Sequence, residues 1–157
     1  MNYLFSFGLL VHIIGITCIA GGSVGGLVLE TQIWKHMQNA PEKVRVLGPL
    51  MSKYPVIIQA GTLLMLASGL VMLGALGWNV AEQGWFIVKM VFVVALVLNG
   101  VLVARPNGLK LRQLVPLLVK GEDVAGEVSR IKRNMTLFHI SELTMLLIVY
   151  LLAVFRF

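Results

Sequence analysis

Four long runs of apolar residues constrain this chain more than any other feature of its sequence. Residues 4–29 and 56–76 contain no charged side chain, residues 85–104 contain one lysine, and residues 135–155 contain one glutamate. A helix needs about 20 residues to cross about 30 Å of hydrocarbon, so each run is long enough to span a membrane. The runs are continuously apolar rather than alternating, which disfavours the strands of a membrane barrel.

The composition excludes the other classes of protein. Hydrophobic residues make up 58% of the 157 residues and charged residues only 13%, whereas an average soluble domain carries about 25% charged residues. A disordered chain is excluded for the same reason. Cys18 is the only cysteine, so no disulfide can form within the chain. We therefore predict an all-α integral membrane protein, with residues 1–157 forming a single transmembrane domain built as a four-helix bundle.

The distribution of basic residues predicts the orientation. Eleven of the thirteen Lys and Arg residues lie in two segments, residues 31–55 and 105–134, and the short connection 77–84 has none. Cytoplasmic loops of membrane proteins carry an excess of Lys and Arg, so both basic segments are predicted to be cytoplasmic and both termini outside. The net charge of +6 thus reflects topology, and we expect no nucleic-acid partner. The predicted location is a bacterial inner (plasma) membrane, with multiple spans in the lipid bilayer.

The two basic loops are predicted to contain short helices. Residues 109–119 alternate apolar and basic positions as a helix on the membrane surface does, with a break or kink at Pro116. A turn at residues 120–123 then precedes a second helix leading into the fourth span. In the first loop, Asn39 is the candidate cap of a short helix that begins near Pro41.

Ionisable residues inside the spans are costly and usually functional. Four occur here, namely His12, Lys89, His139 and Glu142. At 1.5 Å per residue, His12 lies about 12 Å and Lys89 about 6 Å below the outer face, whereas His139 and Glu142 lie near the inner face, as does the neutral Asn99. The two histidines differ in depth by about 12 Å, and axial ligands of one haem iron lie about 4 Å apart. This separation disfavours a haem held by both histidines and leaves a single ligand at His12 open.

Each of these residues has two interpretations. His12 shares a helical face with Gly15, Gly22 and Gly26, and this face can accommodate a flat macrocycle or pack closely against another helix, as small-xxx-small patterns do. Lys89 can pair with cofactor carboxylates or extend to the outer surface.

His139 and Glu142, near the inner face, also have more than one interpretation. His139 and Glu142 lie at positions i and i+3 of one face, where they can orient a ligating imidazole, relay protons, bind a metal with another span, or simply form a structural hydrogen bond. Glu142 is the only acidic residue in the four runs, which disfavours a carboxylate-bridged di-iron site.

Three motifs in register resemble those of a known family. They are Val11-His12-Ile13-Ile14-Gly15-Ile16, Gly84-Trp85-Phe86 followed by Lys89, and Ser141-Glu142-Leu143-Thr144. They resemble the HemJ-type protoporphyrinogen oxidases and their CopD-like relatives, and the likeness covers all four spans in the same order. The resemblance implies b-type haem on His12, with Lys89 and Glu142 as supporting polar groups. This chain is a divergent case, because Asn99-Gly100 stands where the third-span histidine of that family falls.

These observations lead to one main hypothesis and two alternatives. The main hypothesis is a membrane protein that binds haem b and takes part in redox chemistry or electron transfer; whether the chain is itself an oxidoreductase stays open. The alternatives are a non-enzymatic subunit or assembly factor of a larger membrane complex, and a metal or small-ion transport protein. A homodimer is also expected to be compatible with four short spans. The residues expected to bind the cofactor are His12, Gly15, Gly22, Gly26, Lys89 and Glu142, and the candidate metal ligands are His12 and His139.

Overall fold

Six α-helices make up most of the part of the chain that the structure describes. The computed structural model describes residues 3–37, 41–120 and 122–155. The helices are α1 (Tyr3–His36), α2 (Pro41–Leu47), α3 (Lys53–Leu76), α4 (Gly84–Asn99), α5 (Arg105–Val119) and α6 (Ala125–Phe155). Two short 3₁₀ segments, η1 (Gly48–Ser52) and η2 (Trp78–Glu82), precede α3 and α4, and η3 (Gly100–Ala104) is a turn of π-helix. The described residues contain no strand.

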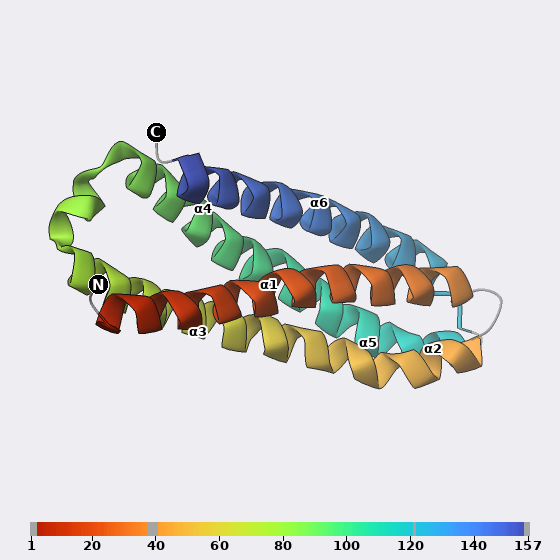
Figure 1. Cartoon of the computed structure of the whole chain (residues 1–157). Helices are drawn as coiled ribbons and strands as arrows, with labels where there is room; N and C mark the ends of the chain where they lie inside the picture. Colours follow the sequence, from red (N-terminus) through yellow and green to blue (C-terminus); the bar gives the residue numbers. More distant parts are fainter. Residues whose placement is uncertain (1–2, 38–40, 121, 156–157) are drawn as a thin grey trace.

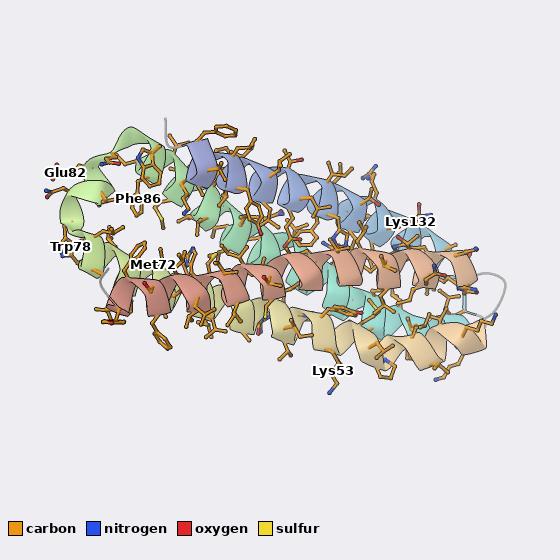
Figure 2. All side chains as sticks on the ribbon, in the orientation of Figure 1. Lys53, Met72, Trp78, Glu82, Phe86 and Lys132 are labelled. Atoms are coloured by element: carbon orange, nitrogen blue, oxygen red, sulfur yellow. The ribbon has the colours of Figure 1, made fainter. Side chains whose placement is uncertain are left out.

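Four helical stretches are long and apolar enough to cross a membrane, which confirms the predicted four-helix membrane bundle. They are Tyr3–His36, Gly48–Leu76, Gly84–Leu118 and Ala125–Phe155. In Figure 1, α1 begins and α6 ends at the same end of the bundle, as an even number of spans requires. We call this the terminal end, and we call the opposite end the basic end, because the two Lys- and Arg-rich segments lie there. Figure 2 places Trp78 and Glu82 at the terminal end and Lys132 near the basic end.

The helices extend well past the predicted span boundaries at the basic end. The first has 34 residues and is therefore about 51 Å long, against about 30 Å of hydrocarbon. The third span likewise continues past Ala104, because α4, η3 and α5 form one helical stretch of 35 residues. The segment predicted as a separate surface helix, residues 109–119, is thus the continuation of the third span.

A proline explains the π-helical turn. Pro106 lies at the start of α5, and a proline inside a helix lacks an N–H and clashes with the carbonyl oxygen four residues earlier. The wider π turn directly before Pro106 accommodates this clash without breaking the helix. Pro116 lies inside α5 near its end, and the helix runs past it to Val119.

The remaining predicted connections are largely helical too. The short helix expected near Pro41 is α2, although its candidate cap Asn39 lies outside the described residues. The turn predicted at residues 120–123 includes Gly121, which also lies outside them. The connection after α3 turns at Gly77, whose φ of +94° is a backbone conformation that favours glycine.

The bundle consists of two helix pairs that meet at the basic end. The first pair is α1 with α3 and the second is α4 with α6, while α3 and α4 make no close backbone contact within the described residues. The pairs diverge toward the terminal end (Figure 1). Buried apolar side chains gather instead at the basic end, where α1, α2, η1, α5 and α6 converge. This core comprises Leu29, Ile33, Met37, Val44, Met51, Leu111, Leu114, Ile131, Met135 and Phe138.

Candidate functional site

Glycines bring α1 and α3 into backbone contact. A Cβ added to Gly15 would lie 2.7 Å from the Met65 nitrogen of α3, and a Cβ added to Gly61 would lie 2.7 Å from the Gly15 carbonyl oxygen. A Cβ on Gly22 would lie 2.6 Å from Cγ1 of Ile58. The absence of side chains here lets the two backbones approach, as in other membrane helix pairs. This close packing fixes which α3 groups face His12.

His12 contacts α3 through its Nδ1 nitrogen. That atom lies 2.9 Å from the Met65 carbonyl oxygen and 3.0 Å from Oγ of Ser68. The carbonyl can only accept a hydrogen bond, and the Ser68 hydroxyl donates its own hydrogen to the Leu64 carbonyl oxygen at 2.6 Å. The Nδ1 nitrogen must therefore donate, which leaves Nε2 of the neutral ring as the nitrogen with the free lone pair.

Lys89 is a charged neighbour of His12. It lies on α4, in the other helix pair, and its charge acts electrostatically on His12. Both side chains are partly exposed.

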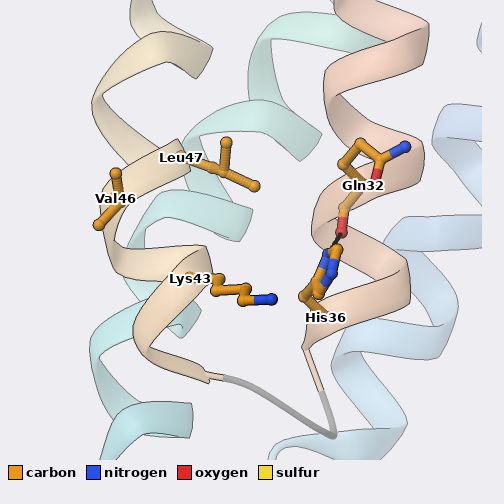
Figure 3. A pocket seen from close by; sticks show the side chains of 5 residues that line it. All are labelled: Gln32, His36, Lys43, Val46 and Leu47. Atoms are coloured by element: carbon orange, nitrogen blue, oxygen red, sulfur yellow. Dashed lines mark hydrogen bonds between the residues drawn. The ribbon is translucent and has the colours of Figure 1, made fainter.

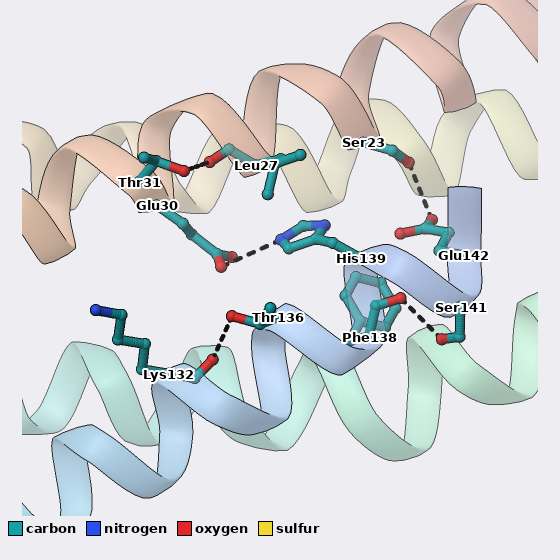
Figure 4. A network of polar contacts seen from close by, with 10 residues as sticks. All are labelled: Ser23, Leu27, Glu30, Thr31, Lys132, Thr136, Phe138, His139, Ser141 and Glu142. Carbon is teal, nitrogen blue, oxygen red and sulfur yellow. Dashed lines mark hydrogen bonds and ion pairs between the residues drawn. The ribbon is translucent and has the colours of Figure 1, made fainter. Parts of the chain in front are cut away.

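A second set of polar side chains lies between α1 and α6. We call Ser23, Glu30, His139 and Glu142 the carboxylate cluster. The Nε2 nitrogen of His139 lies 3.1 Å from Oε2 of Glu30, and the Ser23 hydroxyl donates to Oε1 of Glu142 at 2.9 Å (Figure 4). Their exposed fractions are only 2% for Ser23, 8% for Glu30, 5% for His139 and 6% for Glu142. Two polar residues from each helix, three of the four ionisable, are thus buried between α1 and α6.

The antiparallel arrangement of α1 and α6 accounts for this pairing. Chain direction is opposite in the two helices, so the earlier α1 residue meets the later α6 residue. Ser23 and Glu30 lie two turns apart on one face of α1, and His139 and Glu142 lie one turn apart on one face of α6. Next to the cluster, the Asn99 amide of α4 donates to the Ser141 hydroxyl at 3.0 Å.

The structure separates the residues expected to hold one cofactor. His12 and Lys89 share one region, whereas His139 and Glu142 belong to the carboxylate cluster. The glycines that share a helical face with His12 do not all have the same surroundings.

Gly15 and Gly22 pack against α3, which favours the helix-packing interpretation for these two, whereas nothing lies within 4 Å of a Cβ on Gly26. Whether any of these residues binds a cofactor or metal stays a prediction. Among the described residues, no group of three His, Cys, Asp or Glu side chains has a geometry that could hold a metal ion.

Two cluster members were missed by the sequence analysis. The predicted first span ended at Leu29 and the predicted loop began at residue 31, so Glu30 was assigned to neither, although α1 continues and buries it. The statement that Glu142 is the only acidic residue among the spans is therefore corrected. Ser23 gave no signal because serine is common in membrane helices. Its spacing of seven residues from Glu30 was the one pattern that could have shown a shared polar face.

One open pocket lies at the basic end. It has a volume of about 400 Å³ and lies between the end of α1 and α2, lined by Gln32, His36, Lys43, Val46 and Leu47. Figure 3 shows His36 beside Gln32, whose carbonyl oxygen is 2.8 Å from the His36 Nδ1 nitrogen. This contact lies within one helix, and the residues that line the pocket belong to neither polar region.

Comparison with known proteins assigns the chain to a family. The family described as "Predicted integral membrane protein (DUF2269)" matches residues 8–157. No curated protein and no solved structure matches the chain. The match supports the predicted membrane protein, while the likeness to the HemJ-type and CopD-like proteins stays a resemblance. Because the match covers nearly the whole sequence, the chain belongs to the DUF2269 family of predicted integral membrane proteins.

Proposed function

We propose that this protein binds a b-type haem through His12 in a bacterial inner membrane and takes part in electron transfer. The observation that carries the proposal is the hydrogen bond from Nδ1 of His12 to the Met65 carbonyl oxygen. Histidines that ligate metals commonly donate their other ring nitrogen to a backbone carbonyl, which fixes the ring and its tautomer. Here that bond leaves Nε2 with the lone pair that an iron ligand requires.

The surroundings of His12 fit such a group. Its side chain is only partly buried, on the face of α1 that packs against α3. Ser68 adds a second hydrogen-bonding oxygen to Nδ1. Lys89 supplies a positive charge near His12 from the opposite helix pair, and a lysine in this position can neutralise haem propionates.

Each residue then has a defined task. His12 would hold the iron through the lone pair of Nε2, and the Met65 carbonyl holds the imidazole in orientation. Lys89 balances carboxylate charge at the outer side of the site. A bound b-type haem supplies an iron that changes oxidation state by one electron, with a potential tuned by ligand identity and burial. The proposal does not require Gly15 or Gly22, which α3 covers.

An absorption spectrum tests the proposal. The full chain, purified in detergent with haem supplied during expression, is expected to show a Soret band that His12→Ala removes. His36→Ala is the matched control, since His36 is a partly exposed histidine at the opposite end of the same helix and should leave the band unchanged. Lys89→Met is expected to keep the band and weaken haem retention. A protein without a Soret band, or a band that persists unaltered in His12→Ala, would contradict the assignment.

A further inference from the structure

Two buried polar atoms in the carboxylate cluster have no hydrogen-bond partner among the residues that the structure describes. They are Nδ1 of His139 and Oε2 of Glu142, and both residues are more than nine-tenths buried. In Figure 4 the unbonded oxygen of Glu142 points toward the His139 side of the cluster, away from Ser23. Unsatisfied polar groups in a protein interior are rare and costly, and in lipid no bulk water can compensate them. Their occurrence on adjacent turns of one helix calls for a chemical explanation.

The two atoms are complementary once a proton is added. Glu30 accepts a hydrogen bond from Nε2 of His139, so in the neutral ring Nδ1 is an acceptor. A protonated Glu142 carries an O–H donor on Oε2, and rotation of its side chain toward the neighbouring turn satisfies both atoms. The alternative is an imidazolium facing an ionised Glu142, which satisfies the same two atoms. Both arrangements hold the same number of protons.

The charge of the cluster also favours a bound proton. With both carboxylates ionised and the ring neutral, the cluster carries two negative charges in a low-dielectric interior, where an unpaired charge is very costly. The titratable groups that act on Glu142 are His139 from its own helix and Glu30 from α1. Where α6 faces α4, the neighbouring polar groups are Asn99 of α4 and Ser141 of α6, and both are neutral. The α5 helix meets α6 nearer the basic end, where Asn134 donates to Asn107.

We propose that Glu30, His139 and Glu142 form an intramembrane proton-binding site in which His139 passes a proton between two buried carboxylates. In this step the bond between hydrogen and Oε2 of Glu142 breaks as a bond to Nδ1 of His139 forms. The proton on Nε2 then moves to Oε2 of Glu30. The net charge is unchanged, and no electron is transferred. Ser23 positions Glu142 by donating to its other oxygen.

The site is independent of haem at His12, because it involves different residues and a different helix interface. A proton is the ligand that these donors favour. The described residues offer no three-ligand metal geometry, and a histidine between two carboxylates can accept and release protons on opposite ring nitrogens.

Infrared difference spectroscopy tests the site in the full chain reconstituted in lipid vesicles. As pH is lowered, the wild type should gain the carbonyl band of a buried protonated carboxylic acid, shifted to lower frequency in D₂O. Glu142→Gln should lose this band. Glu82→Gln, at an exposed position of η2, should retain it. Ser23→Ala should move the band without removing it, because one hydrogen bond to the carboxyl group is lost.

Nitrogen-15 spectra of labelled histidine test the relay. The Nδ1 signal of His139, assigned by its absence in His139→Gln, is expected to titrate together with the Glu142 carbonyl band. A His139 signal that keeps the same titration in Glu142→Gln would overturn the relay. A wild-type spectrum without any carboxyl band that titrates and shifts in D₂O would overturn the proton site. A band at the same frequency in wild type and Ser23→Ala would also overturn the proton site. Neither of these two results depends on whether the Glu142→Gln variant folds.

Discussion

The histidines of the spans meet different partners through their ring nitrogens. His12 donates from Nδ1 to a backbone carbonyl, which carries no charge, while His139 contacts a carboxylate through Nε2. The first arrangement fixes the orientation of the ring and the nitrogen that carries its hydrogen, and the second places the ring against a group that can exchange a proton with it. The same side chain thus supports a ligand role in one region and a proton-transfer role in the other.

The buried pair of Glu30 and His139 predicts a non-additive effect on stability. Removing one partner of a buried ion pair leaves the other charge uncompensated and typically costs about 3–5 kcal/mol. We expect this loss for His139→Leu, and partial recovery in the double variant Glu30→Gln with His139→Leu. The measurement is the free energy of unfolding in mixed detergent micelles. Costs of the two substitutions that simply add would show that the pair is not coupled.

At the scale of helices, glycines determine how α1 approaches α3. Gly8, Gly15 and Gly22 are spaced by seven residues, and each faces an α3 residue, in order Met72, Met65 and Ile58. Seven-residue spacing keeps one face of a helix against its antiparallel neighbour. The glycines near His12 therefore belong to two sets, because Gly26 lies outside this repeat and faces open space.

This difference gives a matched test of helix packing. Gly15→Leu should separate α1 from α3 and cost about 1–3 kcal/mol or more, because the new side chain meets backbone atoms that cannot move aside. Gly26→Leu should cost much less, since no atom lies within 4 Å of its Cβ. Thermal unfolding in detergent, followed by circular dichroism, compares the two. Equal destabilisation would show that the glycine spacing does not set the helix contact.

The sequence predicted the number of spans because the cost of burying charge in lipid depends on residue type alone. The same criterion placed the end of the first span too early. It stopped the run at Leu29, whereas the helix continues and Glu30 finds a buried partner on α6. Which helices pair, and which polar residues meet, depends on contacts between distant segments. No pattern along one helix could show that Ser23 faces Glu142.

At the scale of the whole molecule, the two ends of the bundle differ in construction. The basic end has a buried apolar core from five elements, as a water-soluble domain does. Toward the terminal end, apolar side chains such as Leu63 and Phe7 are 69% and 65% exposed, as expected for surfaces that face lipid. The two ends of the bundle thus differ in packing, with a buried apolar core at the basic end and exposed apolar side chains toward the terminal end.

Labelling of single cysteines tests the orientation of this arrangement. In a Cys18→Ser background, a cysteine at Glu82 should react with a membrane-impermeant maleimide on intact bacterial cells. A cysteine at Lys120 should react only after lysis, because the positive-inside rule places the basic end in the cytoplasm. Both positions are exposed, so accessibility within the protein does not differ between them. Labelling of Lys120→Cys on intact cells would reverse the predicted topology.

The π-helical turn at Gly100–Ala104 connects α4, which begins at the terminal end, to α5 at the basic end (Figure 1). A π turn contains one residue more than an α turn, and each residue of a helix rotates the chain by about 100°. The turn therefore acts as a phase shift, after which the same continuous helix presents a different side to its surroundings. Leu111 and Leu114 are buried in the basic-end core, although most of α4 faces outward. Deleting one residue from the turn would restore the α-helical phase and rotate both leucines out of that core.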